Sequence, residues 1–223
     1  MTGRILLLLA STTLLASCFQ GDANGVVDED EDGGGTVDTE VVLKLHPQKE
    51  FCVEYKHEGQ LSGTSKHCMR NWGAEAFTIE NFKIGFGGFS QDQNAHKIII
   101  GDTIYNIDPA KKTGKRTKNP FFDTISKSDP EQLGKIIMDG MGMTDTGEDK
   151  EIDGVSCNIL RSEQLGSACL TDNMVMLEQE VMGVKQIATK VDLNSGGDDA
   201  DYRLYENVTI TEGPDVGAIL EGL

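Results

Sequence analysis

Alternation of apolar and polar residues with a period of two is the feature that most constrains how this chain folds. Phe51, Val53 and Tyr55 alternate with Cys52, Glu54 and Lys56. A second run places four residues on one side: Ile187, Thr189, Val191 and Leu193. A third run, expected to form the last strand, also shares one side: Tyr202, Leu204, Val208 and Ile210. Because successive side chains of a strand point to opposite faces, the pattern predicts antiparallel strands with one apolar face.

Turn residues divide these runs into an antiparallel meander. Gly101-Asp102 stands between Ile98–Ile100 and Thr103–Tyr105, which suits a two-residue hairpin turn. Gly196-Gly197-Asp198 is expected to divide the last two strands.

One segment predicts a short amphipathic helix instead. Asp129 is a good N-cap, Pro130 suits the first helical position and Gln132 can complete a capping box. A second short helix is expected around Asp215 to Leu220. The predicted fold class is mainly β: a strongly curved, open antiparallel sheet, or half-barrel, with one or two short helices packed in or over its concave face. The first helix supplies the candidate plug or lining of an apolar pocket: Leu133, Ile136, Ile137 and Met141.

The N-terminus resembles a bacterial lipoprotein signal peptide. Arg4 precedes an apolar run from Ile5 to Leu15, and Leu15-Ala16-Ser17-Cys18 is similar to a lipobox. The run is too short to span a bilayer but has the length of a secretory h-region. The resemblance implies that residues 1–17 are removed and that Cys18 carries diacylglycerol and palmitate-like chains, which add about 0.8 kcal/mol per buried CH₂ to membrane binding. An ordinary secretory leader is the alternative.

The residue after Cys18 indicates to which membrane the lipoprotein is sorted. Phe19 stands where lipoproteins retained at the inner membrane by the best-known sorting rule carry Asp. The resemblance therefore implies the outer membrane, facing the periplasm, with attachment through the lipidated cysteine.

Residues 18–40 have the composition of a tether. They contain the acidic run Asp28 to Asp32 and Gly33-Gly34-Gly35 but few large apolar residues, so we expect disorder. Asp28, Asp30, Asp32 and Gly33 match the first half of a calcium-loop pattern, but its twelfth position is Thr39 instead of Glu. A solvated spacer is the alternative that we favour. Residues 41–223 then form one β-rich domain, long enough for a genuine core.

Four further cysteines fall into two local pairs. In an oxidising compartment this even count predicts disulfides, and proximity favours Cys52–Cys68 and Cys157–Cys169, each bracketing a hairpin. An alternative is that His57 and His67 bind zinc together with Cys52 and Cys68. The spacings of these four residues are unlike those of common zinc motifs.

Composition and motifs argue against several functions. The formal net charge of −17 disfavours nonspecific nucleic-acid binding. The sequence lacks G-x-S-x-G, H-E-x-x-H and P-loop motifs, and Gly85–Phe89 is expected to be a flexible apolar loop. We therefore expect no enzyme, no cofactor and no metal.

The order of elements from Lys97 onward is similar to the periplasmic lipoprotein-carrier (Lol-type) superfamily, especially its uncharacterised lipoprotein branches. The similarity rests on Lys97 to Pro109, a lysine-rich turn, a helix and then Ile152 to Cys157. It implies a bent sheet around an apolar cavity that accepts acyl chains or another hydrophobic ligand. The carriers lack such an anchor, acidic tether and set of four cysteines. These differences argue against a role as a soluble carrier that shuttles its ligand between membranes.

A basic loop is a candidate contact for anionic lipid head groups or an acidic partner: Lys111, Lys112, Lys115, Arg116 and Lys118. A solvated hairpin tip is the alternative. The sequence thus favours a membrane-anchored envelope lipoprotein whose half-barrel binds a lipid or acyl chain without catalysis. The other hypothesis is an envelope structural or protein-interaction module with a filled core and no ligand.

Overall fold

The structure is a computed structural model that describes residues 43–86 and 89–214. Three segments with sequence predictions lie outside these residues: the signal peptide 1–17 with the lipidated Cys18, the tether 18–40 with its calcium-like pattern, and the helix near residues 215–220. They stay predictions.

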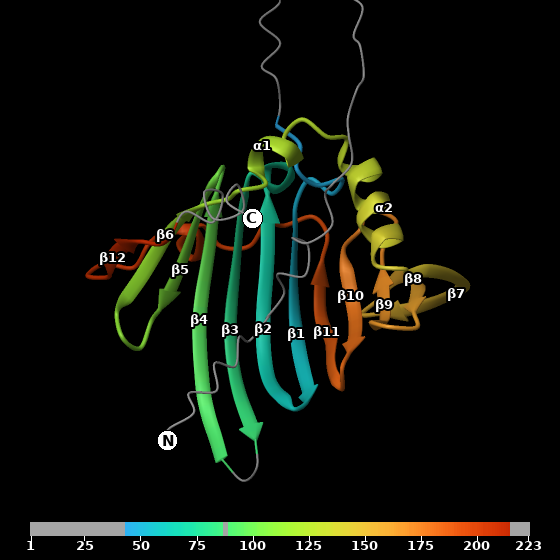
Figure 1. Cartoon of the computed structure of the whole chain (residues 1–223), viewed down its shortest axis with the longest axis horizontal. Coiled ribbons are helices and arrows are strands. Elements are labelled where there is room, and N and C mark those ends of the chain that lie inside the picture. Colours follow the sequence, from blue (N-terminus) through green and yellow to red (C-terminus); the bar gives the residue numbers. More distant parts are fainter. Residues whose placement is uncertain (1–42, 87–88, 215–223) are drawn as a thin grey trace, which may run out of the picture. The chain divides into compact units, whose positions relative to one another are not determined.

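Twelve strands of the described chain form one sheet (Figure 1). Their bounds are β1 Phe51–Gly59, β2 Leu61–Arg70, β3 Glu75–Phe86, β4 Phe89–Ile100, β5 Thr103–Asp108, β6 Thr113–Lys118, β7 Thr144–Ile152, β8 Val155–Ser162, β9 Gly166–Leu170, β10 Met176–Val181, β11 Val184–Asp192 and β12 Thr209–Glu212.

The sheet consists of two antiparallel meanders joined along β1. The order of strands is β12-β6-β5-β4-β3-β2-β1-β11-β10-β9-β8-β7. Strands β1 to β6 run outward in one direction and β11 back to β7 in the other, so neighbours in the sheet are mostly neighbours in the sequence. Only the β12–β6 pair, at one edge, is parallel. The sheet is curved and does not close, which confirms the predicted open half-barrel.

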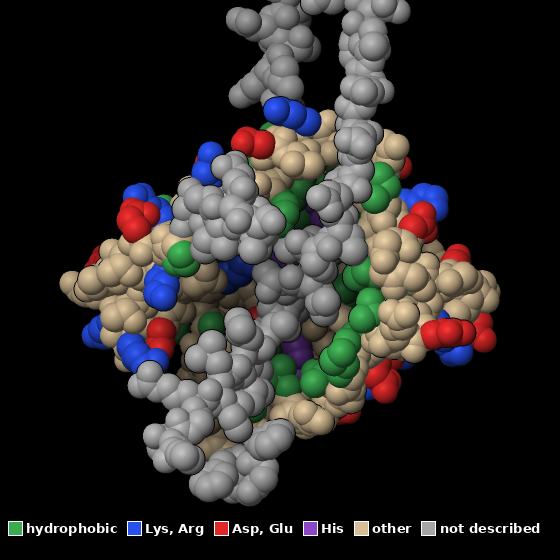
Figure 2. Space-filling view, viewed as in Figure 1, with side chains coloured by type: hydrophobic (Ala, Val, Ile, Leu, Met, Phe, Trp, Pro, Cys, Tyr) green, Lys and Arg blue, Asp and Glu red, His purple; other side chains and the backbone are tan. Residues whose placement is uncertain are grey.

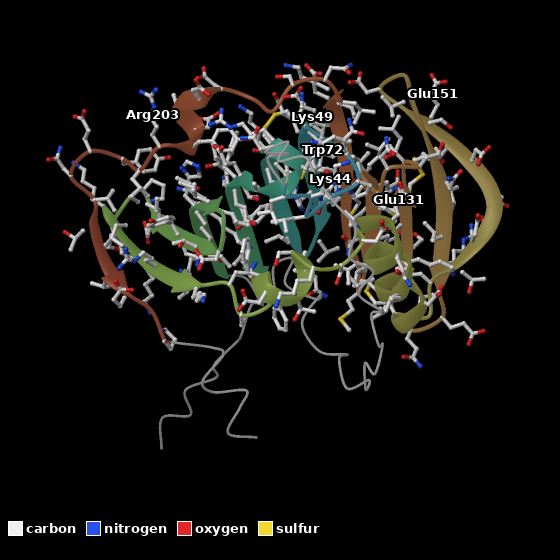
Figure 3. All side chains as sticks on the ribbon, turned by 90° about the horizontal axis from the view of Figure 1, so that it is seen from above. Lys44, Lys49, Trp72, Glu131, Glu151 and Arg203 are labelled. Carbon is white, nitrogen blue, oxygen red and sulfur yellow. A yellow bond between two sulfur atoms is a disulfide. The ribbon has the colours of Figure 1, made fainter. Side chains whose placement is uncertain are left out.

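Helices α1 (Phe122–Ile125) and α2 (Pro130–Gly140) connect β6 to β7. The predicted capping is confirmed in part, because Asp129 Oδ1 accepts a hydrogen bond from the backbone amide of Gln132 at 2.9 Å and Pro130 begins the helix. Seen from above, the sheet arches, and α2, marked by Glu131, lies on the concave side (Figure 3). Two 3₁₀ turns complete the elements of the described chain: η1 Asn71–Gly73 and η2 Asp199–Tyr202.

Each face of the sheet carries its own hydrophobic core. The concave core gathers Phe51, Val53, Tyr55 and Leu177 with residues of β8, β9 and β11. The convex core is smaller and contains Cys68, Phe77, Ile98, Ile107 and Tyr202. Tyr202 belongs to η2, which lies on the convex side near the labelled Arg203 (Figure 3).

Three predicted hairpins are confirmed. Ile100 pairs with Thr103 across the two-residue turn Gly101-Asp102. Cys52 lies directly opposite Cys68 in the β1–β2 hairpin, and Cys157 and Cys169 belong to the paired strands β8 and β9.

The prediction that Ile187, Thr189, Val191 and Leu193 share one face is wrong for the first half of β11. Glu54 pairs with Lys190 but Tyr55 pairs with Ala188, so Thr189 is an extra residue in a β-bulge. The bulge shifts the alternation by one residue. Ala188 therefore shares the concave face with Val191 and is buried, whereas Ile187 turns to the convex face.

The prediction of one last strand from Tyr202 to Ile210 is also wrong, because this segment contains the end of a 3₁₀ turn and a separate short strand. Tyr202 ends the 3₁₀ turn η2, and the strand β12 begins only at Thr209. Tyr202 and Ile210 nevertheless pack with the same convex core. The proposed loop at Gly85–Phe89 is shorter than expected, since β3 extends to Phe86 and β4 begins at Phe89.

Candidate functional site

The concave face of β1 to β4 brings together ionisable and aromatic side chains. The register places Val53, His67, Thr78 and Lys97 in one row across these four strands. The next row contains Tyr55, Ser65, Glu80 and Ala95, and the third contains His57, Gly63, Phe82 and Gln93. All of these residues share one face, because paired residues of a sheet lie on the same side and the alternation is uninterrupted here.

His57 on β1 is held in place by side chains of β2 and β3. Its Nε2 lies 2.8 Å from Ser65 Oγ, and its ring meets the ring of Phe82 edge-on with centroids 4.7 Å apart. His57 and Ser65 are both buried. Burial lowers the pKa of His57 below its ordinary value, so the imidazole is neutral near pH 7.

His67 lies two rows from His57, at the end of a stack of rings. Phe51 contacts His67 edge-on at 5.3 Å between centroids and His46 at 5.4 Å. Burial lowers the pKa of His67 to about 4, with smaller contributions from His46 and Lys97. His46 accepts a hydrogen bond from the backbone amide of Gln48 at 3.0 Å, and burial lowers its pKa as well.

Glu80 and Lys97 are oppositely charged neighbours on adjacent strands. Thr78 pairs with Lys97 and Glu80 with Ala95, so the two charged side chains are diagonal neighbours, about 7 Å apart at Cβ. Both are partly buried. Burial raises the pKa of Glu80 and lowers the pKa of Lys97, and in each case the charge of the other residue opposes the shift. Burial therefore disfavours the charged form of both groups.

An apolar floor adjoins these polar groups on the side of β1, β10 and β11. Phe51, Val53 and Tyr55 continue across the sheet into Ala188 and Leu177, all of them buried. Figure 2 shows hydrophobic side chains along this part of the concave face, with histidines beside them. The hydroxyl of Tyr55 donates to the backbone oxygen of Met176 at 2.7 Å, which fixes the ring within the floor.

The four side chains of the predicted plug differ in how deeply the structure buries them. Leu133 is buried, Ile137 and Met141 are partly buried, and Ile136 is 46% exposed. Helix α2 lies near the upper end of β10 (Figure 1), and an added Cβ at Gly134 would meet Met174 Cε at 3.0 Å. Leu133 is thus the member of the predicted set that the structure packs fully into the domain.

The basic loop is largely neutralised within the domain. Lys111 and Lys112 lie in the turn between β5 and β6, and the other three basic residues lie on β6. Lys111 pairs with Asp108, Arg116 with Glu212, and Lys118 with Asp102 at 3.8 Å. Within the described part of the chain, Lys112 and Lys115 form no ion pair, so they are the members of the set that can reach a partner.

The sulfur atoms of the predicted cysteine pairs lie at disulfide distance. The Cα atoms are 4.0 Å apart for Cys52 and Cys68, and 5.3 Å apart for Cys157 and Cys169. The alternative zinc set is contradicted by the alternation along the strands, because Cys52 and Cys68 point to the convex face whereas His57 and His67 lie on the concave face. Among residues 43–86 and 89–214, no group of three or more His, Cys, Asp or Glu residues is placed to hold a metal.

Two surface depressions lie apart from this face. One, of about 500 Å³, lies beside the tips of the β8–β9 and β10–β11 hairpins and is lined by Arg161, Gln164 and Met182 among others. The other, of about 310 Å³, is lined by convex-face residues such as Glu54, Lys66 and Asn81. No helix in the described ranges is long and apolar enough to cross a bilayer.

Sequence patterns alone do not mark Ser65, Glu80 or Lys97 as residues of a site. A signal for two concave-face residues was present, because pairing Cys52 with Cys68 sets the register of β1 and β2 and places His67 opposite Val53 and Ser65 opposite Tyr55. His57 also continues the alternation of Phe51, Val53 and Tyr55. The positions of Glu80 and Lys97 depend on the register of β3 and β4, which no such marker fixes.

Comparisons with known proteins give distant structural matches. No protein-family model matches the sequence, and no curated protein matches it. An uncharacterized conserved protein from Thermus thermophilus aligns with 74% of this chain and 91% of its own, at 7% identity and a TM-score of 0.48. MucB aligns with 75% of this chain at 11% identity and a TM-score of 0.38, and the chain spans 62% of the MucB structure.

Proposed function

We propose that this protein is an exported, lipid-anchored envelope protein whose concave face binds a hydrophobic ligand, a lipid or an acyl chain, without catalysis. The observation that carries the proposal is the apolar floor of Phe51, Tyr55 and Leu177 beside a partly buried polar row on the same face of an open sheet. An amphiphile has the same division into an apolar chain and a polar end. Sites that bind small molecules are lined in this way, mainly apolar with a few polar groups that fix orientation.

Export and anchoring rest on the N-terminal segment and the cysteines. The lipobox-like Leu15-Ala16-Ser17-Cys18 supports lipidation, and the two cysteine pairs at disulfide distance suit an oxidising compartment. Labelled palmitate should enter the unaltered chain and not Cys18→Ala, and Phe19→Asp should keep the label but shift the protein toward the inner membrane. A wild-type chain without label would refute the anchor, whereas a labelled chain in the inner membrane would refute only the outer-membrane address.

Binding without catalysis fits the surroundings of Ser65. Its hydroxyl lies near His57, the arrangement of a nucleophile with a base, but Ser65 is in the middle of β2 with a paired strand on either side. Acyl transfer needs backbone N–H groups or other donors aimed at the developing oxyanion. The ladders on both sides of β2 engage the neighbouring amides, so we assign the His57–Ser65 contact a structural role.

A second candidate function is an envelope structural or protein-interaction module with a filled core. Val53 and Leu177 are both 0% exposed, so part of the concave face is already packed. In this case Lys112 and Lys115 are the basic residues that can contact an acidic partner.

Ligand extraction separates the two candidates. Residues 19–223, exported through a general signal sequence, should release lipid into organic solvent and take up a fluorescent fatty acid. Ala95→Tyr, which adds a ring on the concave face of β4, should lower the uptake, whereas Asn94→Tyr, one residue away and on the convex face, should not. No extracted lipid and no uptake would favour the filled module.

A further inference from the structure

Two unpaired opposite charges stand out on the concave face. Glu80 and Lys97 are partly buried, yet within the described ranges neither one forms an ion pair or a side-chain hydrogen bond. Other partly buried charges of the same sheet are paired directly, as in Lys66–Asp201 at 2.9 Å and Arg70–Glu75 at 2.7 Å. Desolvating a charge is costly unless a partner compensates for it. The two charges are therefore without compensation inside the described part of the domain, which is the state that a bound group contacting both would relieve.

The separation of the two charges limits what that group can be. As diagonal neighbours they are about 7 Å apart at Cβ, within reach of each other for side chains of this length, yet among the described residues they form no ion pair and are left for a group that can bridge them. A simple anion would be attracted by Lys97 and repelled by Glu80, and a simple cation would meet the reverse. A head group that carries an anion next to a cation is attracted by both residues.

The surroundings of the pair are those of an amphiphile site. Phe82 lies two residues beyond Glu80 on the same face of β3, and Ile99 lies two residues beyond Lys97 on the same face of β4. Both Phe82 and Ile99 belong to the less exposed positions of their strands. Toward β1 the face continues into the buried apolar floor, so a chain attached to a head group at Glu80 and Lys97 can lie against Ile99, which is partly buried and packs against that floor.

We propose that Glu80 and Lys97 form the head-group subsite of the concave face, and that its ligand is an amphiphile whose head group carries a phosphate next to a primary ammonium. Lys97 pairs with the phosphate, and Glu80 accepts hydrogen bonds from the ammonium, both of them charge-assisted. This inference rests on the proposed function, because it names the class of hydrophobic ligand that the same face binds.

Calorimetric titration with three single-chain amphiphiles of one chain length tests the subsite on the unaltered residues 19–223. Lysophosphatidylethanolamine carries both charges, lysophosphatidylglycerol carries only the phosphate, and monoacylglycerol carries neither. The first should bind most tightly, at least about tenfold more tightly than monoacylglycerol, since two charge-assisted contacts are gained. Each ligand is titrated below the concentration at which it forms micelles.

Variants assign the two contacts. Lys97→Met should weaken both phosphate ligands, and Glu80→Gln should weaken only lysophosphatidylethanolamine. The matched controls are Lys83→Met and Asp92→Asn, a lysine and an aspartate that lie opposite each other on the same two strands but on the convex face, and they should change no affinity. Thermal unfolding checks that each variant is folded, and the series on the unaltered chain decides the question independently of the variants.

The outcomes separate this inference from the proposed function. Equal affinity for all three ligands, or tighter binding of lysophosphatidylglycerol than of lysophosphatidylethanolamine, would overturn the head-group subsite while hydrophobic binding stands. Absence of binding by all three would overturn both.

Discussion

The two faces of the sheet treat their charged residues in opposite ways. On the convex face, Lys66 pairs with Asp201, and Arg70 pairs with both Glu75 and Asp199. Arg70 also lies over the ring of Tyr202, 4.0 Å from its centroid. On the concave face, Glu80 and Lys97 are partly buried and stay apart.

On the convex face, the partly buried charges are compensated within the domain. The convex charges bind the segment around η2 to β2 and β3, and Tyr202 completes the contact by packing edge-on against Phe77 and donating to the backbone oxygen of Gly196 at 2.6 Å. These groups find their partners within the domain. The concave charges have partial burial without pairing, which is the state expected of a surface that a ligand completes.

Removal of the Tyr202 ring should give the largest effect of the changes considered. Tyr202→Ala deletes a buried ring from the convex core, so we expect the free energy of unfolding to fall by about 3–5 kcal/mol. Tyr202→Phe keeps the ring and should cost only about 1 kcal/mol for the lost hydrogen bond. Urea unfolding measures both, and ligand affinity of the folded protein should not change. A loss below about 1 kcal/mol for the alanine variant would mean that the convex contact is not part of the stable fold.

The two disulfides allow the stability contribution of the same kind of bond to be compared between the two faces. Cys52–Cys68 belongs to the convex core and Cys157–Cys169 to the concave core, and the sequence separations are 16 and 12. Replacing either pair by alanine should lower the free energy of unfolding by about 3 kcal/mol, since loops of this size gain similar chain entropy. Urea unfolding of the two double variants checks this, and non-reducing peptide mapping checks the pairing. A crossed pairing would contradict the hairpin register on both faces.

Acid should weaken the domain through its histidines. The pKa of His67 is about 4 in the folded protein against an ordinary 6.5, so the unfolded chain binds a proton at a pH where the folded protein does not. Its contribution is therefore fully present above pH 6.5 and is lost as the pH falls toward 4, by about 2 kcal/mol between pH 7 and 5. Burial lowers the pKa of His46, His57 and His96 too, which adds in the same direction.

Unfolding measured at pH 7 and pH 5 isolates His67. His67→Gln should be less sensitive to acid than the wild type by about that amount. Equal pH dependence of the two proteins would show that His67 is accessible to water and not buried in the stack of rings.

The smallest change in stability is expected for the concave charges. Lys97→Met or Glu80→Gln removes a partly buried charge without a close partner, so the free energy of unfolding should stay within about 1 kcal/mol of the wild type or rise. Arg70→Met breaks an existing pair on the convex face and should cost more. Urea unfolding of the three variants checks the order. A loss of several kcal/mol for Lys97→Met would show that Glu80 and Lys97 stabilise the fold as a pair.

Much of the fold could be predicted because it is local. Alternation in β1, the turn at Gly101-Asp102 and the N-cap at Asp129 each depend on a few neighbouring residues. The cysteine pairs added register, since strands that bracket a local pair must lie side by side.

The predictions were wrong where contacts between residues far apart in the sequence determine the local structure. The bulge at Thr189 is set by pairing with β1, more than a hundred residues away, and it reverses the alternation in β11. The 3₁₀ turn ending at Tyr202 replaces a predicted strand because its charges meet Lys66 and Arg70 on the convex face. For the same reason the site could be predicted only in part, because Glu80 and Lys97 become neighbours through the register of β3 and β4.

Photo-crosslinking tests most directly whether the concave face binds the ligand. A fatty acid carrying a diazirine on its chain is added to residues 19–223, and the labelled positions are found by peptide mass spectrometry. We predict labels on partly exposed concave-face residues of β3 and β4, such as Thr78, Ala95 and Gln93, and less labelling when lysophosphatidylethanolamine competes. Labels confined to convex-face residues such as Asn81 and Asn94, or labelling that the competitor does not reduce, would contradict the proposal.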